Sequence, residues 1–297
     1  MYKLFLGLLK KLKFLPQKTY VRIYYRYYTK KKLSLENPQE LNEKIQWLKV
    51  FYRPKILNQL VDKYAVRQYV IDTIGEQYLN KCYGVYDHVN EVDFDALPDQ
   101  FVLKGVHGSG FNLIVKDKAK LNKITARLKM RKWLFHNFYY KAGLEWAYKD
   151  VKPRIIAEEY LEDIDRGILH DYKFFCFNGV PKFIHIDVDR FGDHQRLFYD
   201  IEWNKLPYKH YLPNDANVEK PDSLAEMLKV SEQLSKDFPL VRVDLYSTKG
   251  KIVFGELTFY PGNGVLEFYP DDFNKISGDY LILPKLKQGQ KYITSQS

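Results

Sequence analysis

The chain of 297 residues has only two cysteines, Cys82 and Cys176, and neither lies in a motif with metal-ligand spacing. Two cysteines are too few for a disulfide framework, so we expect a reducing, cytosolic compartment. No apolar run approaches the roughly 18 residues that span a bilayer. Low-complexity linkers and internal repeats are also missing, while aromatic residues reach 16%. This composition predicts a folded globular protein rather than a disordered one.

Acidic residues are missing from the start of the chain. The first 32 residues carry ten Lys and Arg residues and no Asp or Glu, and the whole chain has a net charge of +10. Such a charge favours anionic partners, for example nucleotides or acidic glycans. In residues 1–16 the apolar side chains share one helical face. Two interpretations stay open for residues 1–32: contact with the inner face of a membrane, or a helix docked on the protein with its lysines in water.

The Tyr and Lys residues of 20–32 have the composition of a surface on which nucleic-acid bases stack. We interpret them instead as a helix with packed aromatic rings and exposed lysines. No nucleic-acid partner is therefore expected.

Helical and strand patterns alternate in an order that predicts an α+β fold with antiparallel sheets, not a doubly wound sheet. One helix is expected to open near Asn37-Pro38, and a second to run from residue 55 to the stop at Gly75. Hairpins are expected to turn at Asn178-Gly179 and at Lys249-Gly250. The other predicted segments are a strand at 78–87, a strand–glycine loop–strand unit at 93–117, a helical stretch at 124–148, a strand at 153–163 and a helix at 223–238.

A glycine-rich turn follows the strand that ends at Lys104, and it consists of His107, Gly108, Ser109 and Gly110. Glycines let backbone N–H groups approach a phosphate, and a lysine adds a positive charge. No Gly-Lys-Ser/Thr sequence follows, so this is not a Walker loop. By itself the pattern fits either a phosphate-binding loop or an ordinary hairpin turn.

Two carboxylates are expected to face each other on the second hairpin. Asp244 alternates with apolar neighbours on one strand, and Glu256 lies on the returning strand. With the turn near residue 250, both side chains share a face. Adjacent carboxylates repel each other unless a cation lies between them, and Mg²⁺ binds carboxylates together with substrate phosphates. Mg²⁺ and a surface salt bridge with Arg242 are the two interpretations of this pair.

Seven segments occur in the order of the ATP-grasp fold: "NPQELNEKIQWLK", "LVDKYAVRQYV", "LPDQFVLKGVHGSGFNLIV", "PRIIAEEYLE", "HDYKFFCFNG", "VRVDLY" and "FGELTFYPGNG". Over roughly residues 35–283, the chain resembles the TupA-like ATP-grasp family of polysaccharide-cluster proteins. The resemblance implies two α+β lobes with antiparallel sheets that grip ATP. The expected division is a basic amphipathic extension at 1–34, a helical and α/β subdomain at 35–98, the ATP-grasp domain at 99–284 and a tail at 285–297.

The resemblance also implies which residues bind ATP. Lys63 and Lys104 are the expected ATP lysines, and residues 107–110 are expected to form a mobile loop over the phosphates. Asp171 is expected to reach the ribose, the phosphates or the acceptor. The adenine is expected against a hinge strand formed by Glu158, Glu159, Tyr160 and Leu161.

For the metal and the chemistry, the resemblance implies that Asp244 and Glu256 hold Mg²⁺. Thr258 stands where many ATP-grasp enzymes have Asn, so the third side-chain ligand would be a weaker hydroxyl. The residues that we assign to catalysis are Lys173, together with Arg190 and Arg242, whose guanidinium groups suit an acyl phosphate or a carboxylate.

The implied reaction is carboxylate–amine ligation, in which ATP converts a carboxylate into an acyl phosphate and an amine then displaces phosphate. The expected partners are ATP, an anionic glycan of the uronic-acid type or a lipid-linked glycan, and an amino acid or another amine. Two alternatives stay open. Asp187-Val188-Asp189 has the Asp-X-Asp pattern of a glycosyltransferase that binds metal and nucleotide-sugar, and an ATP-dependent sugar kinase would stop at a phosphorylated product.

Overall fold

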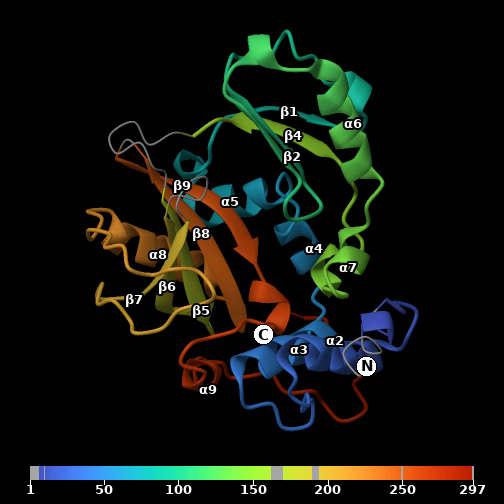
Figure 1. The fold of residues 1–297 in the computed structure, drawn as a ribbon, viewed down its shortest axis with the longest axis vertical. Coiled ribbons are helices and arrows are strands. Elements are labelled where there is room, and N and C mark those ends of the chain that lie inside the picture. Colours follow the sequence, from blue (N-terminus) through green and yellow to red (C-terminus); the bar gives the residue numbers. More distant parts are fainter. Residues whose placement is uncertain (1–6, 10, 162–169, 189–193, 249, 296–297) are drawn as a thin grey trace.

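The computed structural model describes residues 7–9, 11–161, 170–188, 194–248 and 250–295. Two antiparallel sheets with helices packed against them form two lobes, which confirms the predicted α+β fold (Figure 1). In the described ranges the α-helices are α2 (Gln17–Thr29), α3 (Leu41–Phe51), α4 (Ile56–Leu60), α5 (Val66–Ile74), α6 (Lys123–Leu134), α7 (Phe138–Lys141), α8 (Leu224–Ser235) and α9 (Asp272–Asp279). Short 3-10 turns are η1 (Glu76–Tyr78), η2 (Val89–Glu91), η3 (Lys118–Lys120), η4 (Trp146–Tyr148) and η5 (Pro261–Gly264).

The small lobe is built on a four-stranded sheet with the order β1-β4-β2-β3. Its strands are β1 (Cys82–Tyr86), β2 (Phe101–Gly105), β3 (Asn112–Val115) and β4 (Ile155–Glu159). Helix α6 inserts Met130 and Trp133 into the core of this lobe, where they join Phe101 and Leu103 of β2. As predicted, the glycine-rich turn connects β2 to β3, and the Gly105 N–H donates to the Phe111 carbonyl at 2.8 Å to close its base.

The large lobe is built on a five-stranded sheet with the order β7-β6-β5-β8-β9. Its strands are β5 (Asp171–Phe177), β6 (Val180–Val188), β7 (Gln195–Asp200), β8 (Leu240–Thr248) and β9 (Lys251–Thr258). The turn between β5 and β6 confirms the predicted hairpin, because Asn178 and Gly179 have φ values of 49° and 82°. Helix α8 packs on the face that carries Phe174 and Cys176, so Lys173 points to the opposite face.

Helix α3 joins the two ends of the described chain. Asn42 donates to the Leu266 carbonyl at 2.7 Å, and Gln46 donates to the Gly264 carbonyl at 3.0 Å. Beyond the helix, Tyr52 pairs with Ile293 in an isolated bridge. Segments that lie more than 200 residues apart in the sequence therefore share one core.

The first predicted helix begins later than expected, at Leu41 and not near Asn37-Pro38. Glu40 accepts from the N3 backbone while Glu43 accepts from the backbone N–H of Glu40, which forms a capping box. This reciprocal pair satisfies N–H groups that the first turn leaves without partners, so the helix starts there.

The second prediction, one continuous helix over residues 55–74, is wrong. The segment forms two helices, α4 and α5, with a break between Leu60 and Val66. At the break the Asp62 carboxylate accepts from the N–H groups of Tyr64 and Ala65, at 2.8 and 3.0 Å. A side chain that satisfies these donors starts a new helix, and Lys63 is thereby placed in a turn instead of on a helix face.

The basic N-terminal region is partly docked on the large lobe. Helix α2 buries Tyr20, Val21 and Tyr25, as the docked interpretation expects. Before the helix, Phe14 is 81% exposed beside Lys13. Across the described residues, no helix combines the length and the apolar composition that crossing a membrane requires.

Helix α9 touches the start of α3 through Gly278, and this contact leads to a stability prediction. A Cβ atom at residue 278 would collide with the Gln39 carbonyl oxygen and come within 2.8 Å of the Leu41 nitrogen. Gly278→Ala should therefore lower the free energy of unfolding by about 1–3 kcal/mol in urea denaturation. Lys275→Ala, on the exposed side of α9, is the control and should change it little. Equal stability of both variants would contradict this packing.

Candidate active site between the lobes

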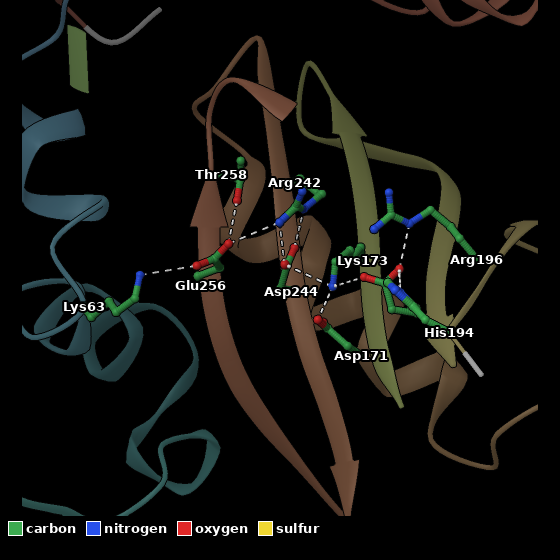
Figure 2. A network of polar contacts seen from close by, with 10 residues as sticks. Lys63, Asp171, Lys173, His194, Arg196, Arg242, Asp244, Glu256 and Thr258 are labelled. Atoms are coloured by element: carbon green, nitrogen blue, oxygen red, sulfur yellow. Dashed lines mark hydrogen bonds and ion pairs between the residues drawn. The ribbon is translucent and has the colours of Figure 1, made fainter. Parts of the chain in front are cut away.

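Charged side chains cross the large sheet in a row, on the face opposite α8 (Figure 2). Lys173 lies at the centre of the row and is only 4% exposed. Its Nζ contacts the Asp171 carboxylate directly, and it lies 3.3 Å from Asp187 and 3.6 Å from Asp244. A buried charge requires partners of opposite sign, so one ammonium group holds three carboxylates together.

The row continues to the edge strand β7. Asp187 on β6 has a fully buried side chain, which accepts from the Arg196 Nε at 2.6 Å and lies 3.2 Å from the His194 Nε2. This carboxylate therefore faces protein cations. The sequence did not single out Arg196 or His194. Arg190 and Asp189, which it did single out, lie outside the described residues.

The two predicted metal carboxylates meet on β8 and β9. Asp244 and Glu256 are paired in the register, as predicted, and Arg242 lies between them. Its Nε and Nη2 donate to the two Asp244 oxygens, both at 2.6 Å, and Nη2 is also 3.2 Å from Glu256. Thr258 donates from Oγ1 to the same Glu256 oxygen at 3.1 Å. The carboxylates thus share one cation already, and the salt bridge with Arg242 is largely buried instead of at the surface.

A β-bulge at Gly255 brings these carboxylates opposite each other. Leu245 pairs with Phe254 while Asp244 pairs with Glu256, so Gly255 is the extra residue on β9. Its position is tight, because an added Cβ would lie 3.0 Å from the Asp244 carbonyl oxygen. Without the bulge, Asp244 would face the glycine. A single glycine in a strand pattern has several explanations, so the sequence alone does not predict this bulge.

The two carboxylates differ in acidity. Burial opposes the ionisation of Glu256, but Lys63, Arg242 and Lys173 outweigh it and lower its pKa to about 2. Burial raises the pKa of Asp244 to about 6, although Arg242 and Lys173 act in the opposite direction. The site therefore holds Glu256 firmly as an anion, while Asp244 gains or loses a proton more readily.

Of the two predicted ATP lysines, Lys63 contacts this carboxylate pair. Lys63, in the turn before α5, has its Nζ 3.4 Å from the Glu256 carboxylate. Lys104 on β2 instead pairs with Glu158 on the neighbouring strand β4, at 2.7 Å. Each lysine therefore has a carboxylate partner within the protein.

The residues of the glycine loop divide into two groups. His107 is 2% exposed, its Nε2 lies 3.0 Å from the Trp133 carbonyl oxygen, and burial lowers its pKa. Gly108 is also buried, since an added Cβ would lie 2.6 Å from the Phe138 ring. Ser109 and Gly110 are exposed, and Gly110 has a φ of 73° with open space around it. Only the second half of the loop is therefore placed to close over a ligand.

The predicted hinge strand is the end of β4 and the residues after it. Glu158 is buried, whereas the side chain of Glu159 is exposed and its N–H donates to the Lys81 carbonyl at 2.9 Å. Tyr160 and Leu161 are half-buried and follow the strand. The structure thus brings Glu158 close to Lys104, and the next three residues form the exit from the small lobe.

The residues on β8 and β9 fit a divalent cation. Mg²⁺ is usually bound by one or two carboxylates and completes its shell with phosphate oxygens and water. Asp244 and Glu256 supply two carboxylates that already bracket a cation, and the Thr258 hydroxyl adjoins them. Among the described residues, no group of three or more His, Cys, Asp and Glu forms a metal cluster.

Two lobes built on antiparallel sheets, with a glycine-rich hairpin on one and paired carboxylates on the other, agree with an ATP-grasp fold. The family model for TupA-like ATPgrasp matches residues 43–282, and the chain belongs to this family. The resemblance drawn from the sequence is thereby confirmed.

Solved structures with a similar fold are distant. A D-alanine–D-alanine ligase from Bacillus anthracis in complex with ATP is 16% identical, with a TM-score of 0.40 over 70% of this chain and 56% of that one. The Helicobacter pylori D-alanine–D-alanine ligase is 14% identical, with a TM-score of 0.42 over 83% and 70%. A phosphoribosylamine–glycine ligase from Thermotoga maritima is 12% identical, with a TM-score of 0.40 over 72% and 52%. The comparison with curated proteins gave no match.

The lowered pKa of Glu256 predicts how acid affects stability. The ionised carboxylate stabilises the fold above its ordinary pKa of 4.5, and this contribution is lost as the pH falls toward 2. The unfolding free energies of the wild type and Glu256→Gln should therefore differ most above pH 4.5 and converge at lower pH. Urea denaturation at several pH values measures this, with exposed Glu202→Gln as the control. A gap that is independent of pH would show that the cations do not hold Glu256 ionised.

Proposed function

We propose that the protein is an ATP-dependent carboxylate–amine ligase that works through an acyl phosphate. The observation that carries the proposal is the contact between Lys63 and Glu256. It sets a lysine beside the phosphate-type loop of one lobe against a carboxylate pair on the other lobe. Such a site can bind the phosphates of ATP from one side and their counter-cation from the other.

Binding of ATP would exchange partners for both lysines. Lys63 and Lys104 would leave Glu256 and Glu158 for the β- and γ-phosphates, and the N–H groups of Ser109 and Gly110 would close over them. The adenine would lie against residues 158–161. These exchanges keep every lysine paired with an anion, so none has to become an isolated buried charge.

Asp244, Glu256 and Thr258 would hold Mg²⁺. When bound there, Mg²⁺ would neutralise charge on the β- and γ-phosphates. Arg242 would then be released from the two carboxylates. A planar guanidinium is suited to binding two oxygens of a carboxylate or an acyl phosphate, and Lys173 adds a positive charge nearby.

In the reaction, a carboxylate oxygen of the acceptor attacks the γ-phosphorus of ATP. The bond from this phosphorus to the β,γ-bridging oxygen breaks, and ADP leaves. An amine next attacks the acyl carbon, phosphate departs with the electron pair of the C–O bond, and the nitrogen loses a proton. The role of Arg242 and Lys173 is to orient the acceptor and to stabilise the transferring phosphoryl group.

The acceptor that we propose is an anionic glycan of the uronic-acid type, free or lipid-linked, and the amine is an amino acid or a related compound. The net charge of +10 supports an anionic acceptor. The two free thiols, Cys82 and Cys176, support a cytosolic location. A glycosyltransferase is less well supported, because Asp187 is engaged by Lys173, Arg196 and His194.

The test combines Asp244→Asn and Glu256→Gln with binding of ATP in the presence and absence of Mg²⁺. Each change removes a charge that Mg²⁺ requires, so each should weaken Mg²⁺-dependent ATP binding at least about 100-fold. The double variant should lose no more than either single one, because the pair acts as one unit. Calorimetry measures the affinity, and exposed Asp72→Asn is the control.

Incubation with uronic-acid oligosaccharides and amino acids then identifies the product by mass spectrometry. An amide supports the ligase, whereas a phosphorylated glycan without amide would identify a kinase. If neither substitution changes the affinity for ATP in the presence of Mg²⁺, the metal assignment is refuted.

Contact with a membrane surface is proposed for residues 1–15 alone. Phe14 is 81% exposed and Leu8 57% exposed, and lysines are frequent around them in the sequence, whereas α2 is docked on the protein. Deletion of residues 1–15 should reduce sedimentation with anionic vesicles and leave ATP binding unchanged. Equal sedimentation of the full chain and the truncated variant would favour the docked interpretation for this segment.

A further inference from the structure

Helix α5 and the turn before it form a seam between the two lobes (Figure 1). The helix buries its valines in the core of the large lobe, whereas β4 belongs to the sheet of the small lobe. The charges along the seam run in opposite order. On the side of α5 Asp62 precedes Arg67, and on the side of β4 Arg154 precedes Glu158, so each acid meets a base.

Asp62 has two functions in this seam. Its Oδ1 accepts from the N–H groups of Tyr64 and Ala65, and its Oδ2 accepts from the Arg154 Nη2 at 2.8 Å. The side chains of Asp62 and Arg154 are only 6% and 21% exposed. The Arg154 guanidinium also lies 5.1 Å from the centre of the Tyr64 ring. One carboxylate thus fixes both the start of α5 and its position against the small lobe.

The same residues fix the base of the glycine loop. Val106 is the first residue after β2, and its N–H donates to the Arg154 carbonyl at 3.0 Å. Its carbonyl accepts from the Lys63 N–H at 3.2 Å. Because Asp62 is covalently joined to Lys63 and ion-paired with Arg154, the four residues close a ring. In this ring the backbone of Lys63 is attached directly to the loop.

A second contact supports the other lysine. Arg67 lies 3.4 Å from Glu158 through Nη1 and donates from Nη2 to the Asn80 carbonyl at 2.7 Å. Glu158 in turn pairs with Lys104 at 2.7 Å. Both predicted ATP lysines are therefore connected to residues that join the lobes.

We propose that Asp62 and Arg154 are positioning residues, which hold Lys63 beside the glycine loop and thereby set the affinity for the phosphates of ATP. The inference rests on the proposed function, since it assigns a ligand to Lys63. Ser109 and Gly110 are exposed, so the loop is fixed at its base, where the ring around Val106 adds to the contacts of Gly105 and His107. A preformed site loses less entropy on binding than one that must be ordered.

Asp62→Asn is the first test, because an amide oxygen still accepts from the two N–H groups while the charge toward Arg154 is lost. Arg154→Gln removes the same pair from the other side and leaves the hydrogen bonds from Tyr64 and Ala65 to Asp62 intact. Each should raise the Kd for Mg-ATP about tenfold in calorimetry. In protein without nucleotide, each should also increase hydrogen exchange at residues 106–111, which a purely global loss of stability would not confine to this loop.

A cycle of variants separates positioning from general destabilisation. The double variant Asp62→Asn/Arg154→Gln should bind ATP no more weakly than either single one, and Arg154→Lys, which keeps the charge, should recover most of the affinity. Asp95→Asn is the control, because it breaks the exposed Asp95–Lys123 pair in the same lobe. It should change neither ATP binding nor exchange at the loop.

Wild-type affinity and wild-type exchange in Asp62→Asn and Arg154→Gln would overturn the inference, and so would losses that simply add in the double variant. Binding of ATP by the wild type would support the proposed function whether or not the inference about Asp62 and Arg154 holds. If the wild type binds no ATP, the proposed function falls. The exchange measurement, which needs no nucleotide, then decides whether the ring holds the loop.

Discussion

Burial of Lys173 among three carboxylates is the constraint on which the polar face of the large sheet depends. Strand β5 is central, so its charges cannot turn to water and must be neutralised by neighbouring strands. Three carboxylates exceed one ammonium, and Arg196 and Arg242 supply the balance from either side. Removal of one partner from such a network typically costs about 3–5 kcal/mol. The row is therefore a single electrostatic unit, in which a change of charge at one residue leaves its partners uncompensated.

In the proposed function, the same arrangement would let ligands with large charges enter a buried site. Lys63 and Lys104 already neutralise Glu256 and Glu158, and Arg242 already bridges the carboxylate pair. In the proposed reaction the ligands exchange these partners and do not add uncompensated charge. A cation at the carboxylates would release Lys63 for the phosphates, and phosphates would release the carboxylates for the cation. This linkage predicts that nucleotide and metal bind with positive cooperativity.

The sequence predicted features that depend on residues close together in the chain. The turn at Asn178-Gly179 needs only two residues that accept positive φ. The hairpin that brings the strands of Asp244 and Glu256 together also follows from local sequence, whereas the direct pairing of the two residues depends on the bulge at Gly255. The break between α4 and α5 was missed, because the apolar pattern continues across it. The Arg154 that holds Asp62 lies 92 residues away, so no local pattern could reveal their contact.

Within the site, Lys63, Lys104 and the carboxylates were predicted through the order of family segments, which is a global signal. The bulge at Gly255 was not, since a single glycine in a strand has several explanations. His107 was grouped with the loop by its position in the sequence, yet its ring packs toward Trp133. Which way a side chain points at a turn depends on its tertiary neighbours, and the local sequence does not specify these.

The contacts of α3 have a consequence for the order in which the protein forms on the ribosome. Residues 82–159 contain all four strands of the small sheet, so this sheet can pair as soon as β4 has emerged. Helix α3 is synthesised earlier, but its partners Gly264, Leu266 and residues of α9 come more than 200 residues later. The apolar face of α3 therefore lacks these packing partners during most of translation. In vectorial synthesis the lobe that begins first is completed last.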